Sequence, residues 1–569
     1  MVEKQYSLWL ENAVMDEDLI KELKEMQGND ELISDAFYKD LEFGTAGLRG
    51  VIGAGTNRMN VYTVGKATQG LAAYVNSITA NGKVAIAYDS RIKSDVFAKI
   101  AAQIFAANGI KVYLYKELMP TPMLSFAVRY LNCDAGVVVT ASHNPAKYNG
   151  YKAYGPDGCQ LGPEAADYVL SIMNKVDIFA DIKSMDFDEA LSAGKIEYIG
   201  SEVISAYLDR VQAQRVSPEL DLSNLNVIYT PLHGSGNKPV RTILDRIGAK
   251  NVTVVKEQEL PDGNFPTAPY PNPEIKQAFE CALNLAKTVP ADLLLATDPD
   301  ADRVGIAISH NGEYKLLSGN DVGALLLNYV LSRRKENGTL PDGCVAVKTI
   351  VSTEICKKIA EKYNCKLIEV LTGFKFIGEQ ISILEEKNEA YKYVFGFEES
   401  YGYLAGDHVR DKDAVVASML ICEMAAYYKE KGLTLLDELD NIYKEFGYYY
   451  SVQKSFTCEG QSGMKRIEEI MRTLRSKAPT EIGGNDVVRI NDYKTSVSVD
   501  TVTKESETLT LPKSNVLCYF LKCGSSVIVR PSGTEPKIKI YINAVGKTSA
   551  DADKKRSNLL EAGTQLLGF

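Results

Sequence analysis

Short apolar segments alternate with longer stretches of helical periodicity through most of the chain. Between residues 83 and 115, an apolar segment, a helical pattern and a second apolar segment follow one another, and the same order recurs over 226–255. Glycine follows several of the helical patterns, which favours helix ends at those positions. This alternation is typical of α/β layers built around partly parallel sheets.

The last quarter of the chain has a different pattern. Apolar and polar residues alternate with a period of two in the segments 496–502, 516–521, 526–530 and 537–542. This period predicts strands with one buried face, and a helical pattern over 550–567 closes the chain. The sequence therefore predicts a small antiparallel sheet with helices, an α+β unit.

Length and turn-rich joints indicate several domains. A chain of 569 residues is too long for one core, and about three to five domains are expected. Helical periodicity gives way to polar or turn-rich sequence at 213–224, 333–343 and 444–453, which makes these segments candidate joints.

Composition is that of an ordinary globular protein, with 45% hydrophobic and 24% charged residues. The net charge of −10 argues against general nucleic-acid binding, which needs a basic face. The amino-terminal residues have no signal-peptide core, and no uncharged apolar run reaches the roughly 18 residues of a membrane span. We therefore expect no membrane partner and a cytoplasmic location. The ten cysteines include no C-x-x-C pair, so mostly buried free thiols are expected.

Candidate chemistry begins where the apolar segment 137–139 ends in the sequence TASHNP, residues 140–145. The hydroxyl of Ser142, the imidazole of His143 and the carboxamide of Asn144 belong either to an ordinary turn or to a loop that presents reactive groups. No G-x-S-x-G elbow surrounds Ser142, which excludes a hydrolase serine of that type.

Three aspartates alternate directly after the apolar segment 293–297, at Asp298, Asp300 and Asp302. Carboxylates this close repel one another unless a cation neutralises them, and Mg²⁺ prefers such hard oxygen ligands. An EF-hand does not fit, because Arg303 occupies the sixth loop position, where glycine belongs. A solvated acidic turn is the alternative, and Arg303 could instead hold an anion beside a metal.

Three further loops carry groups suited to sugars and phosphates. Glu398, Glu399 and Ser400 follow an apolar segment, and carboxylates and hydroxyls pair well with sugar hydroxyls, which both donate and accept. The sequence RPSGTEPK (530–537) joins two strand patterns, and its arginine, hydroxyls and amides suit phosphate. The glycine-rich segment 43–50 is another candidate anion loop. The alternative for residues 398–400 is an acidic surface turn, and the alternative for residues 530–537 is a polar hairpin.

Together these loops resemble the α-D-phosphohexomutase family. TASHNP resembles the family's phosphoserine loop, DPDADR its Mg²⁺ loop, GFEESYG its sugar-recognition loop and RPSGTEPK its phosphate-binding loop. GTAGLRG, YDSR, PLHGSG, PDGNFPTAPYPNPE and TGFKFIG resemble further landmarks, in the family's order over nearly the whole chain. The resemblance implies an α/β fold, with three similar mixed-sheet α/β domains and a C-terminal α+β domain around a central cleft. The implied domains, for phosphoserine, metal, sugar and phosphate in turn, are 1–211, 212–325, 326–447 and 448–569.

The resemblance also implies residue roles. The implied catalytic residues are Ser142, which would carry the phosphoryl group, His143 and Lys152. The implied metal ligands are Ser142, Asp298, Asp300 and Asp302. The implied substrate-binding residues are Thr45, Arg49, Arg303, Thr372, Glu398, Ser400, Lys412, Arg530, Ser532, Gly533 and Thr534. The general acid and base stay open between His143 and Lys152, with Lys412 and Arg49 as weaker candidates.

The implied activity moves phosphate between C1 and C6 of a hexose, with sugar phosphates as partners, Mg²⁺ as cofactor and glucose 1,6-bisphosphate as primer. Glu398 and Ser400 resemble glucose-handling members, so interconversion of glucose 1-phosphate and glucose 6-phosphate is the leading interpretation. Phe397 also resembles a branch that includes pentose phosphate mutases. Mannose phosphate, dual-specificity and ribose 1-phosphate mutases therefore remain alternatives, as do a phosphatase and a non-catalytic homologue.

Overall fold

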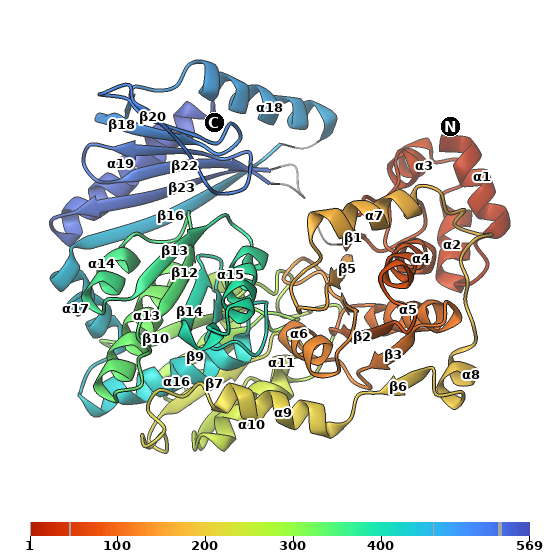
Figure 1. The fold of residues 1–569 in the computed structure, drawn as a ribbon, viewed down its shortest axis with the longest axis horizontal. Coiled ribbons are helices and arrows are strands. Elements are labelled where there is room, and N and C mark those ends of the chain that lie inside the picture. The colour runs from red at the N-terminus through yellow and green to blue at the C-terminus, as the bar shows by residue number, and fades with distance from the viewer. Residues whose placement is uncertain (1, 45–46, 459, 533–536) are drawn as a thin grey trace. The chain divides into compact units, whose positions relative to one another are not determined.

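The computed structural model describes residues 2–44, 47–458, 460–532 and 537–569 (Figure 1). These residues form two compact units, and the chain passes between them several times. The first unit contains Met1–Ser318, Ile377–Tyr393 and Ser400–Thr434, and the second contains Gly319–Phe376, Val394–Glu399 and Leu435–Phe569.

A six-stranded mixed sheet with the order β1-β5-β4-β2-β3-β6 opens the first unit. Its strands are β1 (Gly47–Val51), β2 (Lys83–Tyr88), β3 (Lys111–Leu114), β4 (Ala135–Val139), β5 (Tyr148–Tyr154) and β6 (Ile196–Tyr198). Strands β4, β2, β3 and β6 pair in parallel, whereas β5 is antiparallel to β4 and β1. Parallel strands need cover on both faces, and β4 is buried at every position. The accompanying helices are α4 (Val61–Ile78), α5 (Ser94–Ala107), α6 (Thr121–Tyr130) and α7 (Pro163–Met173).

Three helices precede this sheet and join its core, namely α1 (Val2–Asn12), α2 (Glu17–Glu25) and α3 (Asp30–Phe37). Trp9 of α1 is fully buried, and its ring meets those of Phe37 and Tyr62 edge to face, with centroids 5.8 and 5.5 Å apart. The side chains of Asp16 and Asn29 cap α2 and α3 by accepting hydrogen bonds from main-chain N–H groups.

A second mixed sheet of the first unit has five strands in the order β11-β10-β9-β7-β8. Its strands are β7 (Asn226–Thr230), β8 (Asn251–Val254), β9 (Leu293–Thr297), β10 (Val304–His310) and β11 (Glu313–Leu316). Strand β7 is parallel to β8 and β9, and β10 turns back along β9. Helix α16 (Ala414–Glu430) packs against β9 and β10, and α9 (Ser201–Gln212) and α10 (Asn237–Arg246) pack against α16. The acidic sequence at 298–302 therefore forms the turn between β9 and β10.

The second unit begins with a sheet in which β13, β12 and β14 are neighbours in that order. These strands are β12 (Val345–Thr349), β13 (Lys366–Val370) and β14 (Tyr393–Glu398). Strands β12 and β13 are parallel, and α14 (Ile355–Lys362) lies in the connection between them. The long helix α13 (Gly319–Glu336) precedes β12. Strand β14 is buried at all its positions and ends in the predicted sugar loop.

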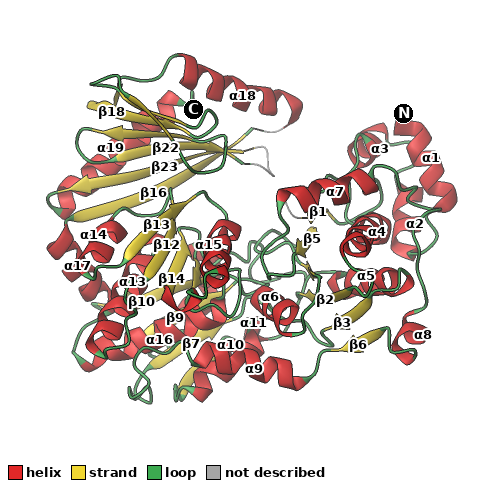
Figure 2. Ribbon diagram, in the orientation of Figure 1, coloured by secondary structure: helices red, strands yellow, loops and turns green. Residues whose placement is uncertain are grey.

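An antiparallel sheet closes the second unit in the order β16-β23-β22-β21-β18-β19-β20, with β17 paired to β18 (Figure 2). Its strands are β16 (Tyr448–Thr457), β17 (Glu481–Ile482), β18 (Asn485–Asp492), β19 (Val497–Asp500), β20 (Ser506–Thr508), β21 (Leu517–Leu521), β22 (Ser526–Pro531) and β23 (Lys537–Gly546). The helices with it are α18 (Gly460–Ser476) and α19 (Ser549–Leu566). Helix α19 packs on β23 through Leu559, which shares a core with Ile540 and Ile542. The remaining elements are α8 (Phe187–Ser192), α11 (Lys256–Glu259), α12 (Glu280–Leu285), α15 (Phe374–Glu386), α17 (Leu435–Phe446), β15 (Gly402–Leu404) and the 3-10 helices Lys276–Phe279 and Ala390–Lys392.

The predicted fold class is confirmed, with mixed α/β sheets followed by an antiparallel α+β part. The four domain boundaries stay predictions. All ten cysteines are free and most are buried, as predicted. Among the described residues, no helix combines the length and the apolar character needed to cross a bilayer.

Candidate active site

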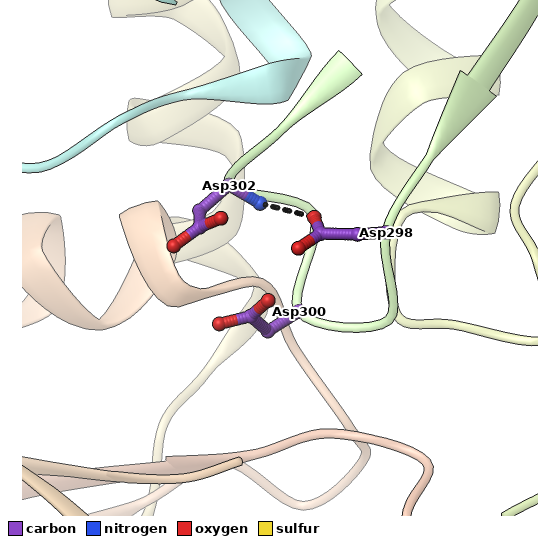
Figure 3. Close-up of side chains that lie close together, drawn as sticks. All are labelled: Asp298, Asp300 and Asp302. Carbon is purple, nitrogen blue, oxygen red and sulfur yellow. Dashed lines mark hydrogen bonds between the residues drawn. The ribbon is translucent and has the colours of Figure 1, made fainter. Parts of the chain in front are cut away.

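Three carboxylates converge in the turn between β9 and β10 (Figure 3). Asp298, Asp300 and Asp302 are buried, and one oxygen of each lies within 4.8 Å of the others. The main-chain N–H groups of Asp302 and Arg303 donate to Asp298 Oδ1 at 3.1 and 3.0 Å. The turn itself therefore directs the carboxylates towards one another.

Burial and mutual repulsion dominate the electrostatics of this carboxylate cluster. Burial and then the charges of Asp300 and Asp302 raise the pKa of Asp298 well above its usual range. Burial also acts to raise the pKa of Asp302, but Lys412 and Lys152 hold it well below its usual range. The Oδ1 atoms of Asp300 and Asp302 have no hydrogen-bond partner within the described residues. Buried, unpartnered carboxylate oxygens beside a third carboxylate fit a hard divalent cation such as Mg²⁺.

Two ammonium groups lie against the cluster. The Nζ atom of Lys152, on β5, is 2.8 Å from Asp300 Oδ2, and the Nζ atom of Lys412 is 3.0 Å from Asp302 Oδ2. Burial would lower the pKa of Lys152, but the charges of Asp300 and Asp302 outweigh it and raise that pKa. Lys152 is therefore a cation at neutral pH, suited to stabilising an anion rather than to removing a proton.

The amino-terminal end of α6 fixes the acidic turn from the other side. The hydroxyl of Thr121 donates to Asp300 Oδ2 at 2.8 Å, and its main-chain N–H donates to the carbonyl of Asp300 at 2.9 Å. Thr121 carries no functional signal in the sequence, because PTPM in isolation indicates only the start of a helix.

Ser142 lies in the loop after β4 and reaches the acidic turn. Its side chain is buried, and its Oγ donates to Asp298 Oδ2 at 3.0 Å. The same Oγ is 3.1 Å from His143 Nδ1. Its backbone is left-handed, with φ of 54°, a conformation that costs a non-glycine residue energy and that the surroundings must impose. The loop thus brings Ser142, His143 and the three aspartates together, as the sequence predicts.

The imidazole of His143 is held neutral. Burial and then the positive charges of Arg303 and Arg49 lower the pKa of His143 well below its ordinary value. Arg303 also pairs with Glu274, with Nη1 2.7 Å from Oε1, and Arg49 lies on β1. A neutral imidazole beside Ser142 Oγ can accept a proton, and the two guanidinium groups give the site its anion-attracting side.

Arg91 holds the backbone of the Ser142 loop, and the sequence analysis did not assign it a role. Its side chain is fully buried and donates from Nη1 to the carbonyls of Pro145 and Tyr148, both at 3.0 Å. From Nη2 it donates to the carbonyls of Ser142, at 2.5 Å, and Asn144. The motif YDSR, noted only as a family landmark, was the available signal.

A second network holds the same loop through its N–H side. Thr140 Oγ1 accepts the main-chain N–H of Ser142 at 2.8 Å and donates to Asp89 Oδ2 at 2.6 Å. Asp89 in turn pairs with Arg91, with Oδ2 3.4 Å from Nε, and also accepts from Ser94 Oγ at 2.8 Å. These contacts supply the restraint that the left-handed Ser142 needs.

The second unit contains Glu398 and Glu399 of the predicted sugar loop. Glu398 is buried at the end of β14, and its Oε1 accepts from the main-chain N–H of Gly373 at 2.7 Å. The preceding Thr372 has a buried Oγ1 without a hydrogen-bond partner in the described part of the chain. Burial and the nearby charge of Glu398 raise the pKa of Glu399 to about 7. The carboxylate of Glu398 and the hydroxyl of Thr372 thus lie close together and can bind a polar ligand.

Cationic side chains of the antiparallel sheet face these carboxylates within the second unit. The charges of Lys539 and Arg530 act on Glu399, in the direction opposite to burial. Arg530 lies on β22 directly opposite Lys539 on β23, and its Nη1 donates to Tyr541 Oη at 3.4 Å. The pairing of β22 with β23 thereby places Arg530 close enough to Glu399 for its charge to act on that carboxylate.

The other predicted residues are placed as follows. Ser532 is half-buried and donates its main-chain N–H to the carbonyl of Lys537 at 2.8 Å, and Ser400 is half-buried in the first unit. Thr45, Gly533 and Thr534 lie outside the described residues.

Two loop histidines support structure. Both ring nitrogens of His233 have partners, the carbonyl of Leu260 at 3.1 Å and Thr267 Oγ1 at 2.9 Å. The Nε2 atom of His408 is 2.9 Å from Asp413 Oδ2. His233 and His408 therefore bind other parts of the structure and do not belong to the cluster around Ser142.

Sequence comparison finds relatives over nearly the full chain. Family models described as phosphoglucomutase/phosphomannomutase, alpha/beta/alpha domains I, II and III, match residues 40–178, 205–312 and 318–446. A phosphoglucomutase of Staphylococcus saprophyticus subsp. saprophyticus is 38% identical over 538 residues, which cover 94% of this chain and 96% of the relative. A phosphoglucomutase of Staphylococcus epidermidis is 40% identical over the same length, with the same coverage.

Solved structures share the fold. The exocytosis-sensitive phosphoprotein pp63/parafusin from Paramecium, in its open form, superimposes with a TM-score of 0.69 over 93% of this chain and 96% of that chain, at 18% sequence identity.

Proposed function

The chain belongs to the phosphoglucomutase/phosphomannomutase family, and we propose that it interconverts glucose 1-phosphate and glucose 6-phosphate as an intramolecular phosphotransferase. The observation that carries this proposal is the position of Ser142 Oγ, 3.0 Å from Asp298 Oδ2 at the buried carboxylate cluster. Phosphoryl transfer depends mainly on positioning and on charge stabilisation, and this arrangement supports both.

The reaction uses Ser142 Oγ twice. A phosphoryl group on Oγ passes to the free hydroxyl of a sugar monophosphate, so that the P–O bond to serine breaks while the bond to the sugar forms. The resulting glucose 1,6-bisphosphate turns around, and Ser142 Oγ takes the other phosphoryl group. No phosphate is released, and glucose 1,6-bisphosphate from solution primes an unphosphorylated enzyme.

The acidic turn supports charge stabilisation at this step. Asp298, Asp300 and Asp302 would hold Mg²⁺ together with the phosphate on Ser142. The cation would neutralise negative charge on this phosphoryl group during its transfer. Lys152 and Lys412 already offset part of the carboxylate charge, so the cluster keeps an ordered geometry.

Proton transfer at the serine is assigned to His143. Its neutral imidazole, with Nδ1 3.1 Å from Ser142 Oγ, takes the hydroxyl proton when Oγ attacks, and when Oγ leaves it passes to Oγ the proton that the attacking sugar hydroxyl gives up. Lys152, held as a cation, suits stabilisation of the sugar oxyanion. We therefore propose different roles for these two residues.

Substrate-binding roles are proposed for residues of each unit separately. In the second unit, Glu398 accepts hydrogen bonds from sugar hydroxyls, Thr372 adds a hydroxyl, and Arg530 binds the phosphate that is not reacting. In the first unit, Arg49 and Arg303 contact the reacting phosphate. Thr45, Ser400, Lys412, Ser532, Gly533 and Thr534 complete the proposed substrate contacts.

A coupled mutase assay tests the proposal. The full chain is incubated with Mg²⁺ and glucose 1,6-bisphosphate, and glucose 1-phosphate, mannose 1-phosphate and ribose 1-phosphate are compared while released phosphate is recorded. We expect the highest kcat/KM with the glucose ester and no release of phosphate. A clear preference for mannose or ribose ester would overturn the sugar assignment, and stoichiometric phosphate release would indicate a phosphatase.

A further inference from the structure

Two cysteines lie side by side at the amino ends of neighbouring parallel strands in the second unit. Cys344 directly precedes β12, and Cys365 directly precedes β13. Val345 lies opposite Lys366 in the register of these strands, and the Lys366 N–H donates to the carbonyl of Cys344 at 2.9 Å. One residue earlier in this register, Cys344 faces Cys365. Adjacent strands are about 4.8 Å apart, which lies in the Cα separation of roughly 4.4–6.8 Å found in disulfides.

The two thiols interact in the reduced protein. The Sγ atom of Cys365 is 3.5 Å from the carbonyl oxygen of Cys344. The pKa values of the two thiols are also linked, since the neighbouring Cys365 thiol lowers the pKa of Cys344 and Cys344 raises the pKa of Cys365. The two sulfurs therefore have different character, with Cys344 closer to a thiolate.

A cation reinforces this difference. The positive charge of Arg334, at the end of α13, also acts to lower the pKa of Cys344. The guanidinium is itself largely desolvated, which lowers the pKa of Arg334, and its Nε has no hydrogen-bond partner in the described part of the chain. A thiol beside a guanidinium group and a second thiol has the electrostatic surroundings of a reactive cysteine.

The pair lies just beneath the surface. Cys344 and Cys365 have exposed fractions of 1% and 8%, but Gly343, Asn364 and Lys366, their direct neighbours in sequence, are exposed. A small neutral oxidant needs only a slight opening of these strand ends to reach the sulfurs, whereas a protein or a bulky reagent is excluded.

We propose that Cys344 and Cys365 are a peroxide-sensitive dithiol that closes into an intrachain disulfide. The Cys344 thiolate attacks one oxygen of hydrogen peroxide, so that an S–O bond forms, the O–O bond breaks and hydroxide leaves. The sulfur of Cys365 then attacks the sulfenic sulfur, the S–S bond forms, and the S–O bond breaks with release of water, the Cys365 proton going to the departing oxygen. Two electrons pass from the sulfurs to the peroxide.

The disulfide would tie β12 to β13 across the crossover that contains α14. This linkage restrains the unfolded chain and therefore favours the folded second unit. It lies at the amino end of β12, whereas Thr349, at the other end of the strand, contacts Glu399 of the sugar loop. The proposal does not rest on the proposed function, since it concerns residues outside the acidic turn and the sugar loop.

Peptide mapping of the oxidised full-length chain provides the test. The protein is treated with a small molar excess of hydrogen peroxide at neutral pH, its remaining thiols are alkylated, and the digest is analysed by mass spectrometry without reduction. We expect the peptide linked through Cys344 and Cys365 to appear before any oxidation of Cys281 or Cys523, which are half-exposed. Oxidation of Cys281 or Cys523 first would show that exposure alone sets reactivity and would overturn the proposal.

Variants separate the two sulfurs. In Cys365→Ser the sulfenic acid on Cys344 has no thiol to react with, so dimedone present while the peroxide-treated protein is unfolded should label Cys344. In Cys344→Ser the remaining Cys365 should stay unlabelled, and the control Cys523→Ser should form the disulfide as the unmodified chain does. Equal labelling of both single variants, or none in either, contradicts the assigned roles.

Discussion

The guanidinium of Arg91 donates a hydrogen bond of 2.5 Å to the main-chain carbonyl of Ser142. The same side chain reaches the carbonyls of Asn144, Pro145 and Tyr148, so one buried cation shapes the loop that presents the serine. The left-handed backbone of Ser142 is unfavourable in isolation, and these hydrogen bonds stabilise it. The geometry around Ser142 therefore depends on a residue that does not touch the reacting atoms.

Replacing Arg91 by lysine should slow turnover more than it weakens binding. Lysine keeps the charge but loses the planar fork that serves four carbonyls, and Ser142 Oγ then shifts from its position. We expect kcat to fall by about 100-fold, because misplacement by ~1 Å costs that much, while KM changes by less than about threefold. Arg246→Lys, at an exposed pair with Asp209, is the matched control. A raised KM at unchanged kcat would show that Arg91 acts in substrate binding instead.

Replacing Ser142 by alanine should remove the phosphoenzyme. After incubation with glucose 1,6-bisphosphate, the unmodified chain should gain the mass of one phosphoryl group and the variant should not. Activity should fall at least about 1000-fold, as expected for loss of a nucleophile. Ser171→Ala changes an exposed serine of α7 and should leave both readouts intact. Phosphorylation that persists in Ser142→Ala would place the phosphoserine elsewhere.

Replacing Asp300 by asparagine should weaken Mg²⁺ binding directly. Titration of Mg²⁺ against thermal unfolding measures this without turnover, because a ligand bound to the folded state raises Tm. We expect the apparent Kd to rise at least about tenfold, since even outer contacts of a metal site contribute tenfold or more. Asp209→Asn, at the exposed pair with Arg246, should titrate as the unmodified chain does. An unchanged Mg²⁺ titration in Asp300→Asn would move the cation to another site.

The ion pair between Lys348 and Glu369 should make the second unit sensitive to acid. Burial opposes it, but Lys348 and Lys357 lower the pKa of Glu369 to about 2, below the unfolded value of about 4.3. A lowered folded pKa contributes stability that is complete above the unfolded pKa and is lost as the pH falls through the folded one.

Glu369→Gln tests this pH dependence. Because Glu369 is partly exposed, the unmodified chain should be more stable by only about 1 kcal/mol at pH 6. The difference should shrink between about pH 4.3 and pH 2, as measured by urea unfolding at each pH. Glu361→Gln, whose partner Lys358 is on the surface, is the control. A difference that is the same at pH 6 and pH 2 would contradict the assignment.

Local pattern was enough to identify the elements and the chemical loops of this protein. The period of two in β22 and β23, the buried run of β9 and the motifs around Ser142 and Asp298 are all properties of residues near one another in sequence. Strand and helix periodicity follow from which face a side chain takes, and that depends on neighbours a few residues away. The fold class was therefore accessible from the sequence alone, whereas the grouping of Ser142 with Asp298, 156 positions away, was expected only from the resemblance to the family.

Tertiary structure decided how those groups are held and charged. Thr121 meets Asp300 across 179 positions, and Arg91 meets Ser142 across 51, and no local pattern encodes such pairs. The lowered pKa of His143 and the raised pKa of Lys152 likewise follow from burial and from charges brought in by distant segments. Protonation depends on the whole surroundings of a group, so it emerges only when the chain has folded.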